Sequence, residues 1–473
     1  MIHQCDVAIL GAGPAGASAA IEARARGISV VVFDEAPAAG GQVYRIAAAI
    51  RPAQHDHDRA AGDALRASLA ESRADVRVGQ RVWDVEHDSD GFTIHALGED
   101  GPSRVRARAL IVANGAQERV VPVAGWERPG VIGLAAATVL LKAQRVLPGH
   151  NVVVAGTGPL LLVVAAAILK GGGRVAAVID ANPRSAWIAD WRTLVTRPDL
   201  LLRGAAWLGT LVAHGVTPIA ARAIRSIDGN PTVTGVTIGH VDGRSGNERT
   251  IACDAVCLGH GLTPATDVTR LLCIDHVFDQ AAGSWHAQVD ADQCSSLARL
   301  YVCGDAAGVA GAAAAPLQGR LAALAAARDL GHIDAATFTS STASLRREAV
   351  RAAGFGAAMN ALSTPPSAIV QSMTPETVVC LCEHLTRKEL DAAVTAGAAT
   401  FNDLKSATRC GMGPCGGRLC EDAAARLIAL NTGATRVMIG QATGRPPLRP
   451  VELDALVGKF DYDALPMAQP APL

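Results

Sequence analysis

Two copies of one sequence pattern, far apart in the chain, constrain the fold more than any other feature. Residues 7–34 and 151–180 each contain an apolar run of strand length, a glycine-rich turn, an apolar run of helix length and a second strand that ends in aspartate. A strand, a glycine-rich turn and a helix that leads to a second strand form a βαβ unit, whose two strands lie parallel. The duplication therefore predicts an α/β fold with two Rossmann-like dinucleotide-binding domains.

The segments around the second copy predict that the first domain is discontinuous. Strands are expected at 76–86, 92–97 and 105–113, and a further strand, followed by an Ala-rich helix, is expected at 300–303. We predict a first domain of residues 1–118 and 256–332, a second domain of 119–255, a helical linker of 333–374, a cysteine-containing domain of 375–455 and a tail of 456–473.

Composition and charge exclude several classes of protein. Apolar residues make up 49% of the chain and charged residues 18%, which is typical of a globular rather than a disordered protein. The formal net charge is -1, and no basic stripe indicates binding to nucleic acid or to a membrane surface. The uncharged stretch 152–169 is long enough to span a membrane, but its Gly-Thr-Gly-Pro turn divides it into a strand and a helix. The N-terminus lacks a secretory signal pattern, so we expect a cytoplasmic protein without a transmembrane segment.

The first glycine turn has the full context of a dinucleotide-binding fingerprint. It follows a strand, opens a helix and precedes Asp34 at the end of the next strand. Gly11 permits the tight turn, Gly13 lets the backbone approach a pyrophosphate, and Gly16 lets the helix pack closely on the strand. The helix N-terminus favours anionic phosphates, and Asp34 can accept hydrogen bonds from an adenosine ribose.

A late Gly304-Asp305 pair after another apolar strand supports this site, and with it the chain resembles the two-dinucleotide-domain flavoprotein reductases. In that family the first glycine motif and the late Gly-Asp pair bind FAD. The resemblance also places Gly41 and Gln42 beside the isoalloxazine ring. NAD in this site, or a sheet that binds nothing, is the alternative. The candidate FAD-binding residues are Gly11, Gly13, Pro14, Ala15, Gly16, Asp34, Glu35, Gly41, Gln42, Val82, Asn114, Gly115, Gly304 and Asp305.

The second copy departs from the fingerprint at the third glycine. Gly156 and Gly158 are present and Asp180 ends the second strand, but Leu161 stands in the third glycine position. A leucine there should hold the helix away from the strand and change the seat of the pyrophosphate. Three alternatives stay open, namely NAD(P)H that reduces the flavin, an adenine nucleotide with a structural role, and an empty site. The candidate contacts are Gly156, Gly158 and Asp180.

Four cysteines near the C-terminus form a second informative pattern. One residue separates Cys380 from Cys382, and four residues separate Cys410 from Cys415. The spacing differs from the paired Cys-x-x-Cys knuckles of zinc sites and from plant-type and bacterial ferredoxins. It resembles the small [2Fe–2S] domain of bacterioferritin-associated ferredoxin, and iron–sulfur clusters of this kind are held by cysteine thiolates. Zinc and no metal are the alternatives. Cys420 is expected to be a core residue rather than a fifth ligand.

The flavin domains and the cysteine domain together resemble one family along nearly the whole chain, the α subunits of heteromeric FAD/[2Fe–2S] dehydrogenases. Members include octopine and nopaline oxidases, D-hydroxyproline dehydrogenase, archaeal proline dehydrogenase complexes and hydrogen cyanide synthase. Residues 408–418 are the most specific stretch, and residues 445–450 support it. The resemblance implies an amino-acid-oxidase-like β subunit that oxidises the amine, an electron acceptor and, in some relatives, an FMN at the subunit interface. A small γ subunit is a further candidate partner.

The patterns predict an FAD-dependent oxidoreductase, and the resemblance implies that it serves as the electron-transfer α subunit of a heteromeric amine, opine or hydroxyproline dehydrogenase. No pattern indicates a base that acts on a substrate in this chain, so no catalytic residue is assigned. The chief rival is a self-contained NAD(P)H-dependent flavin reductase that feeds the [2Fe–2S] centre, which requires a working second nucleotide site. A third interpretation is a scaffold that carries zinc instead of a redox centre.

Overall fold

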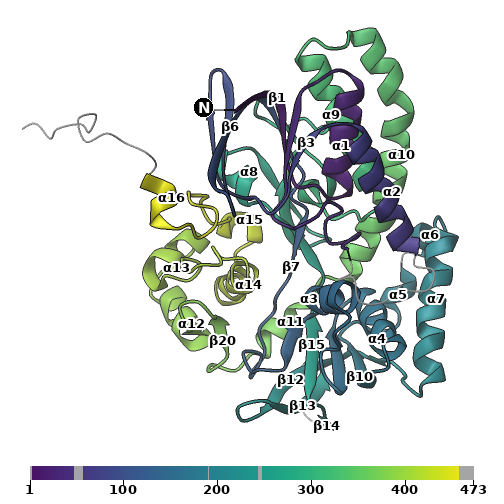
Figure 1. Ribbon diagram of the computed structural model, residues 1–473. Helices are drawn as coiled ribbons and strands as arrows, with labels where there is room; N and C mark the ends of the chain where they lie inside the picture. Colours follow the sequence, from purple (N-terminus) through teal and green to yellow (C-terminus); the bar gives the residue numbers. More distant parts are fainter. Residues whose placement is uncertain (1–2, 47–56, 190, 243–247, 458–473) are drawn as a thin grey trace, which may run out of the picture.

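The duplicated pattern is present as two sheets in the computed structural model, which describes residues 3–46, 57–189, 191–242 and 248–457 (Figure 1). In the first sheet the strand order is β3-β2-β1-β6-β5-β4, and β19 also pairs with β6. The strand pairs among β1, β2, β3, β6 and β19 are parallel, whereas β5 pairs antiparallel with both β4 and β6. The strands are β1 (His3–Leu10), β2 (Val30–Phe33), β3 (Asp75–Arg77), β4 (Arg81–Asp88), β5 (Gly91–Gly98), β6 (Gly101–Val112) and β19 (Leu300–Val302).

The predicted strand 76–86 is in fact two strands, β3 and β4, because the chain turns at Gly79 with a φ of +66°. The turn makes backbone hydrogen bonds that the apolar pattern does not predict. The backbone N–H of Gly79 donates to the carbonyl of Ala36, and the N–H of Gln80 donates to the carbonyl of Asp34. The connection between β3 and β4 therefore holds the loop that follows β2.

Small residues allow the helices of the first domain to pack closely. Helix α1 (Pro14–Ala25) lies against α9 (Ala315–Asp329), and α10 (Ala335–Leu362) packs on α9. A Cβ atom on Gly319 would lie 2.0 Å from the carbonyl oxygen of Ala15, so glycine is needed where α1 and α9 meet. The buried core between these helices and β1 consists largely of alanine, valine and isoleucine.

The second sheet has the strand order β11-β10-β9-β15-β8, with parallel pairs throughout. The uncharged stretch 152–169 forms β9 and α4, which confirms the predicted strand and helix. The predicted domain boundary at residue 256 is wrong here, because β15 pairs with β9 and β8 and so belongs to the second sheet. The elements are β8 (Val131–Gly133), β9 (Asn151–Gly156), β10 (Arg174–Asp180), β11 (Ile219–Ala220), β15 (Ala255–Gly259), α3 (Leu134–Val139), α4 (Leu160–Lys170) and α7 (Pro198–Ala213).

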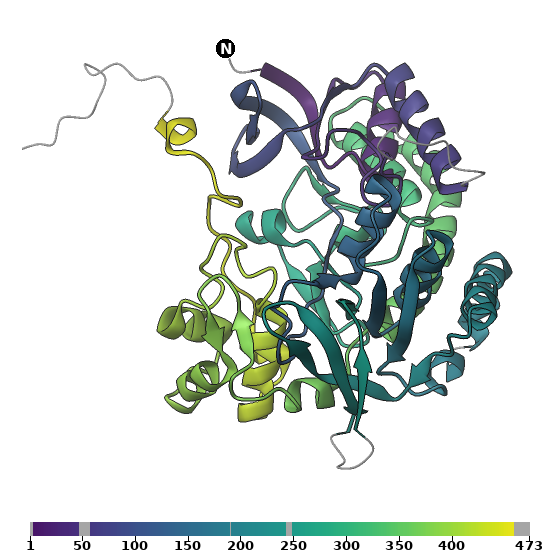
Figure 2. The same ribbon diagram turned by 60° about the horizontal axis from the view of Figure 1, so that its bottom comes forward.

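A small domain of short helices follows α10 and lies on the opposite side of the molecule from α9 and α10 in both views (Figures 1 and 2). Thr386 and Thr400 each form a capping box, and the pattern Thr-x-x-Glu at residues 386–389 is typical of such a helix start. Gly433 ends α14 with a φ of +72°, a conformation in which glycine is favoured at a helix end. The elements are α11 (Ser367–Gln371), β20 (Val378–Cys380), β21 (Leu385–Thr386), α12 (Arg387–Thr395), α13 (Phe401–Thr408), α14 (Glu421–Thr432) and α15 (Arg436–Ile439).

Buried ion pairs join this small domain to the rest of the chain. Arg119, which is 1% exposed, follows β7 (Ala116–Glu118), and its Nε lies 3.6 Å from the Oδ2 of Asp422. Asp422 also pairs with Arg426 at 2.8 Å and with Arg436 at 3.0 Å. One carboxylate therefore faces three guanidinium groups. A second link runs from Arg418 to Asp267, whose atoms lie 2.6 Å apart.

The remaining elements include strands of three small sheets, with the strand orders β12-β13-β14, β16-β7 and β17-β18, and several helices, of which α2 packs against α1. Among the described residues no helix is long and apolar enough to cross a membrane. The tail predicted from residue 456 lies almost entirely outside the described residues. These elements are α2 (His57–Glu71), η1 (Leu140–Gln144), α5 (Ala186–Ala189), α6 (Trp191–Leu194), β12 (Arg222–Gly229), β13 (Val233–His240), β14 (Arg249–Ala252), β16 (Leu262–Pro264), α8 (Asp267–Leu271), β17 (His276–Asp279), β18 (Ser284–Ala287), η2 (Gly304–Ala307) and α16 (Leu453–Val457).

Candidate cofactor sites

The first glycine turn is held in shape by Asp34. The Oδ2 atom of Asp34 accepts a hydrogen bond from the N–H of Ala12 at 2.6 Å, and its Oδ1 accepts one from Ala36 at 2.8 Å. Burial raises the pKa of Asp34, and the two N–H donors oppose that shift. Gly11 has a φ of +100°, and a Cβ on Gly16 would lie 1.8 Å from the carbonyl oxygen of Gly11. Both positions therefore require glycine.

Several residues that are distant in the sequence meet at this turn. A Cβ on Gly13 would come near only Gly41, at 3.8 Å, so the backbone of Gly13 is open to close approach by a ligand. A Cβ on Gly304 would lie 2.9 Å from the Cβ of Ala15. The Oδ1 of Asn114 is buried and has no hydrogen-bond partner among the described residues.

The carboxylate of Asp305 accepts hydrogen bonds from the loop that follows it. Its Oδ1 accepts hydrogen bonds from the N–H groups of Ala310 and Gly311, at 3.0 and 2.9 Å. Burial raises the pKa of Asp305, and these two donors lower it. Asp305 thereby fixes the loop that leads into α9, next to the glycine turn.

The second glycine turn is covered by the chain itself. A Cβ on Gly158 would lie 2.1 Å from the Oγ of Ser363, a residue just beyond the end of α10. The hydroxyl of Thr157 donates to the carbonyl of Ser363 at 2.7 Å. The side-chain amide of Asn182 donates to the carbonyl of Leu362 at 2.6 Å. Residues 362–363 therefore lie on the turn where a pyrophosphate would be expected.

Asp180, at the end of β10, is also occupied by its own neighbours. Its Oδ1 accepts from the N–H of Asn182 at 2.9 Å, and its Oδ2 accepts from the indole N–H of Trp187 at 2.8 Å. Burial raises the pKa of Asp180 to about 6, against the effect of both donors. Leu161 is fully buried in the core that packs around α4 and β9.

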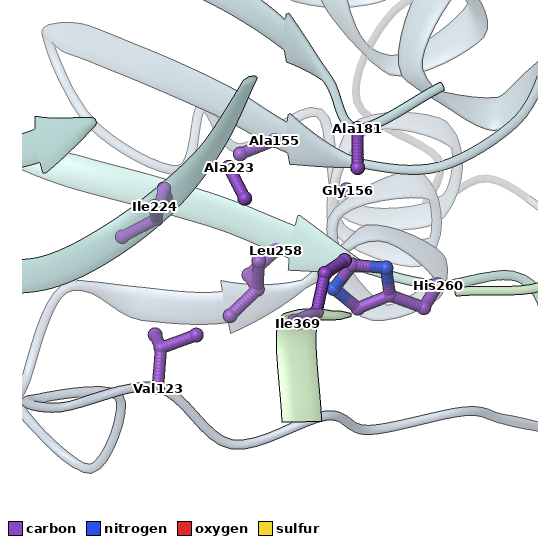
Figure 3. Close-up of a pocket in the computed structure, with 9 residues that line it drawn as sticks. All are labelled: Val123, Ala155, Gly156, Ala181, Ala223, Ile224, Leu258, His260 and Ile369. Carbon is purple, nitrogen blue, oxygen red and sulfur yellow. The ribbon is translucent and has the colours of Figure 1, made fainter. Parts of the chain in front are cut away.

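A small apolar pocket lies at the ends of the strands of the second sheet (Figure 3). Ile369 of α11 and His260 both line this pocket. His260 is 3% exposed, and its Nδ1 lies 3.2 Å from the hydroxyl of Thr157. Burial, with the positive charges of Arg119 and Arg426, lowers the pKa of His260 to about 3, so the ring is neutral at physiological pH. The lining residues are Val123, Ala155, Gly156, Ala181, Ala223, Ile224, Leu258, His260 and Ile369.

The C-terminal cysteines converge from three segments. Cys380 ends β20, Cys410 follows α13, and Cys420 precedes α14. The sulfur atoms of these three buried residues all lie within 4.8 Å of one another. Cys415 is half-buried and Cys382 is exposed, and the backbone N–H of Cys415 donates to the sulfur of Cys382.

The surroundings of Cys380 favour its thiolate, whereas the neighbouring Cys380 sulfur and burial raise the pKa values of Cys410 and Cys420. Hydrogen bonds from the thiols of Cys410 and Cys420, together with the N–H groups of Gly411 and Glu383, lower the pKa of Cys380 to about 2. A Cβ on Gly413 would lie 2.2 Å from the Cβ of Cys382, so the loop passes too close to the sulfurs for a larger residue.

Comparison with known proteins assigns each of two parts of the chain to a family. Residues 5–331 match the family model described as pyridine nucleotide-disulphide oxidoreductase, and residues 378–429 match that of the BFD-like [2Fe–2S] binding domain. The chain belongs to the pyridine nucleotide-disulphide oxidoreductase family. It is a flavin-dependent oxidoreductase of this family with a C-terminal BFD-like [2Fe–2S] domain.

Individual relatives match nearly the whole length of this pyridine nucleotide-disulphide oxidoreductase. The chain is 34% identical to an opine oxidase subunit from Agrobacterium tumefaciens, over 95% of this chain and 91% of that protein. It is 31% identical to the hydrogen cyanide synthase subunit HcnB of Pseudomonas aeruginosa, over 94% of this chain and 97% of that protein. The crystal structure of L-proline dehydrogenase from P. horikoshii has the same fold, with a TM-score of 0.71 and 19% identity over 96% of this chain and 80% of that chain.

The residues around the first turn fit the FAD that the oxidoreductase family implies. The open backbone at Gly13, the unpartnered Oδ1 of Asn114 and the N-terminus of α1 provide an approach for a pyrophosphate and a group for a polar partner. Other predicted contacts lie further out. Glu35 and Gln42 are exposed, and Val82 lies at the start of β4, on the edge strand of the first sheet. Direct contact of each predicted residue with FAD stays a prediction.

Cys420 lies in the core, as expected from the sequence, but it also lies beside Cys380 and Cys410, which the sequence reasoning did not predict. A signal was present, because Cys415 and Cys420 repeat the spacing of Cys410 and Cys415. The arginines beside the cysteines are paired, Arg409 with Glu383 at 2.9 Å and Arg418 with Asp267. Arg409 is thereby paired within the small domain, whereas Arg418 joins that domain to α8.

We expect Asp180→Asn to flatten the pH dependence of stability between about pH 4 and pH 6. Because burial raises the pKa of Asp180 to about 6 in the folded chain, folding takes up a proton in this window and the free energy of unfolding falls as pH rises through it. The variant cannot titrate, so that part of the slope should disappear. Urea unfolding at several pH values measures it, and parallel curves for wild type and variant would contradict the assignment.

Proposed function

We propose that the chain is the electron-transfer α subunit of a heteromeric amine, opine or hydroxyproline dehydrogenase. An amino-acid-oxidase-like β subunit would oxidise the substrate, and this chain would pass the electrons from its flavin site to its cysteine centre and on to an acceptor. FAD exchanges electrons in pairs, and a [2Fe–2S] centre passes them singly. The chain's own residues position these two groups within one polypeptide.

The main support for the proposal is that residues 362–363 cover the second glycine turn. A flavin reductase of this fold that used NAD(P)H would need the turn at Gly158 open to a pyrophosphate. Ser363 lies against that turn, and the carbonyls of Leu362 and Ser363 are bound by Asn182 and Thr157. Asp180, the candidate ribose contact, is already bound by Trp187. A pyrophosphate would therefore meet residues 362–363 at the second turn, which favours entry of electrons from a partner.

The relatives support a role as one component of a larger enzyme. The opine oxidase protein of Rhizobium meliloti, the HcnB protein of hydrogen cyanide synthase and the alpha chain of sarcosine oxidase from Rhizobium meliloti are each named as subunits. We extend to this chain the expectation of a β subunit, with a small γ subunit as a further candidate. The eleven cysteines form no disulfide and all lie within the described residues, which suits the cytoplasmic location that we propose.

The proposal also covers the cofactors that the family comparisons leave open. An FMN at the interface with the β subunit would be released by the denatured complex and not by the denatured lone chain. An adenine nucleotide at the second turn is the less favoured alternative, because residues 362–363 lie there.

We expect NADH to leave the flavin of the purified chain oxidised under anaerobic conditions, and dithionite to reduce it. An opine, D-hydroxyproline or another secondary amine should reduce the flavin only after the β subunit has been added. Flavin absorbance followed in a stopped-flow instrument measures both reactions. Rapid bleaching by NADH or NADPH with the lone chain would instead establish the self-contained reductase.

A further inference from the structure

The cysteine centre holds one more thiol than a [2Fe–2S] cluster uses. Such a cluster is bound by four cysteines, and five cysteines gather in this domain. Cys380, Cys410 and Cys420 form an inner trio with almost no solvent exposure, whereas Cys382 and Cys415 form an outer pair. The trio and the pair are not equivalent, because only the outer pair is open to solvent.

The distances within the inner trio are short enough for its sulfurs to bind a single metal ion together. In a tetrahedral thiolate site with metal–sulfur bonds of about 2.3 Å, two sulfurs on one metal lie about 3.8 Å apart. The three inner sulfurs lie within 4.8 Å of one another. Four ligands shared by two irons leave two positions for each iron. If Cys382 and Cys415 fill two positions, the inner trio offers three thiols for the other two.

Both other members of the trio lie beside Cys380. The sulfurs of Cys410 and Cys420 each lie within 4.8 Å of the sulfur of Cys380 and of each other. A hydrogen bond fixes the backbone of each of these two cysteines. The N–H of Cys410 donates to the hydroxyl of Thr408 at 3.2 Å, and the carbonyl of Cys420 accepts from Ala424 within α14. Either thiol can therefore remain beside Cys380 when the other is removed.

We propose that Cys410 and Cys420 are interchangeable ligands of the cysteine centre, so that Cys380 is paired with either one while Cys382 and Cys415 complete the set. The inference rests on the [2Fe–2S] centre in the proposed function. It revises the ligand set Cys380, Cys382, Cys410 and Cys415, because the loss of Cys410 alone would leave four cysteines in place. The thiol that is not bound donates a hydrogen bond to the sulfur of Cys380.

The test compares Cys410→Ala, Cys420→Ala and the double variant, purified anaerobically as the full chain. Alanine is used because a serine oxygen could still bind iron. Cys380→Ala removes the shared member of the trio, and Cys303→Ala, a fully buried cysteine in the first domain, is the matched control. Bound iron and acid-labile sulfide, and the electron paramagnetic resonance signal of the dithionite-reduced protein, are measured. Retained FAD reports that each variant has folded.

We expect each single variant at 410 or 420 to keep its iron, with a shifted resonance signal, and the double variant and Cys380→Ala to lose both. The control should match wild type. If either single variant alone loses iron as completely as the double variant, the two cysteines are not interchangeable and the proposal is overturned. Zinc instead of iron in the wild type would overturn the redox role in the proposed function, and the same variants would then report interchange through their zinc content.

Discussion

Gly16→Ala is expected to release FAD from the purified chain and to destabilise the first domain. The added Cβ would lie 1.8 Å from the carbonyl oxygen of Gly11 and 3.2 Å from the Cγ2 of Ile9. Backbone cannot yield as a flexible side chain can, so α1 would have to move away from β1 and carry its N-terminus away from the pyrophosphate. Overpacking of this kind costs about 1–3 kcal/mol or more. Flavin absorbance per chain after gel filtration measures the loss, with the unfolding midpoint as a second reading.

The matched control is Gly204→Ala, another glycine within a helix. Gly204 lies in α7, where a Cβ would have no atom within 4 Å. Alanine is favoured over glycine inside a helix by up to about 1 kcal/mol, so this variant should keep FAD and be slightly more stable. A Gly16→Ala chain that retained FAD as fully as this control would show that α1 need not pack closely for the flavin to bind.

Asp422→Asn is expected to lower the free energy of unfolding by about 3–5 kcal/mol, the usual cost of breaking a buried ion pair from one side. The substitution would leave the guanidinium groups of Arg119, Arg426 and Arg436 around a neutral amide. Arg119 has almost no contact with solvent, and its Nε and Nη1 have no hydrogen-bond partner among the described residues. Urea unfolding at neutral pH measures the change. Asp199→Asn, which removes an exposed pair with Arg197, is the control and should have little effect.

The same carboxylate predicts how stability changes in acid. Burial alone would raise the pKa of Asp422, but Arg426, Arg436 and Arg119 hold it well below its usual range. Because the folded pKa is depressed, the stabilisation is present above the unfolded pKa of about 3.9 and is lost as pH falls below it. Wild type should therefore lose more stability than Asp422→Asn between about pH 4 and pH 2. An equal loss in both chains would show that Asp422 is not the group responsible.

Local patterns predicted much of the fold, because they depend on residues a few positions apart. The glycine turns, the capping box at Thr386 and the C-cap at Gly433 are of this kind. The sheet to which β15 belongs depends on pairing with β9, about 100 residues earlier in the chain, and no local pattern reveals it. The contact of Ser363 with Gly158 is likewise made only when α10 ends beside the second sheet.

In the candidate sites, too, residues in local patterns could be predicted, and contacts between distant residues could not. Cys410 and Cys415 are recognised by their spacing, but the approach of Cys420 to Cys380 depends on how the core that contains both residues packs. Arg119 is unremarkable in sequence, since its partner Asp422 lies in another domain. Side chains whose partners are distant in the chain were therefore the ones that sequence reasoning left out.

The cover on the second glycine turn has a metabolic consequence for the proposed enzyme. A flavin that NADH cannot reach is insulated from the ratio of NADH to NAD⁺ in the cell. Its redox state would then follow only the supply of the amine and the availability of the acceptor. Such a protein can remain ready to oxidise a scarce nutrient when the nicotinamide pool is fully reduced, and it does not drain that pool when the nutrient is absent.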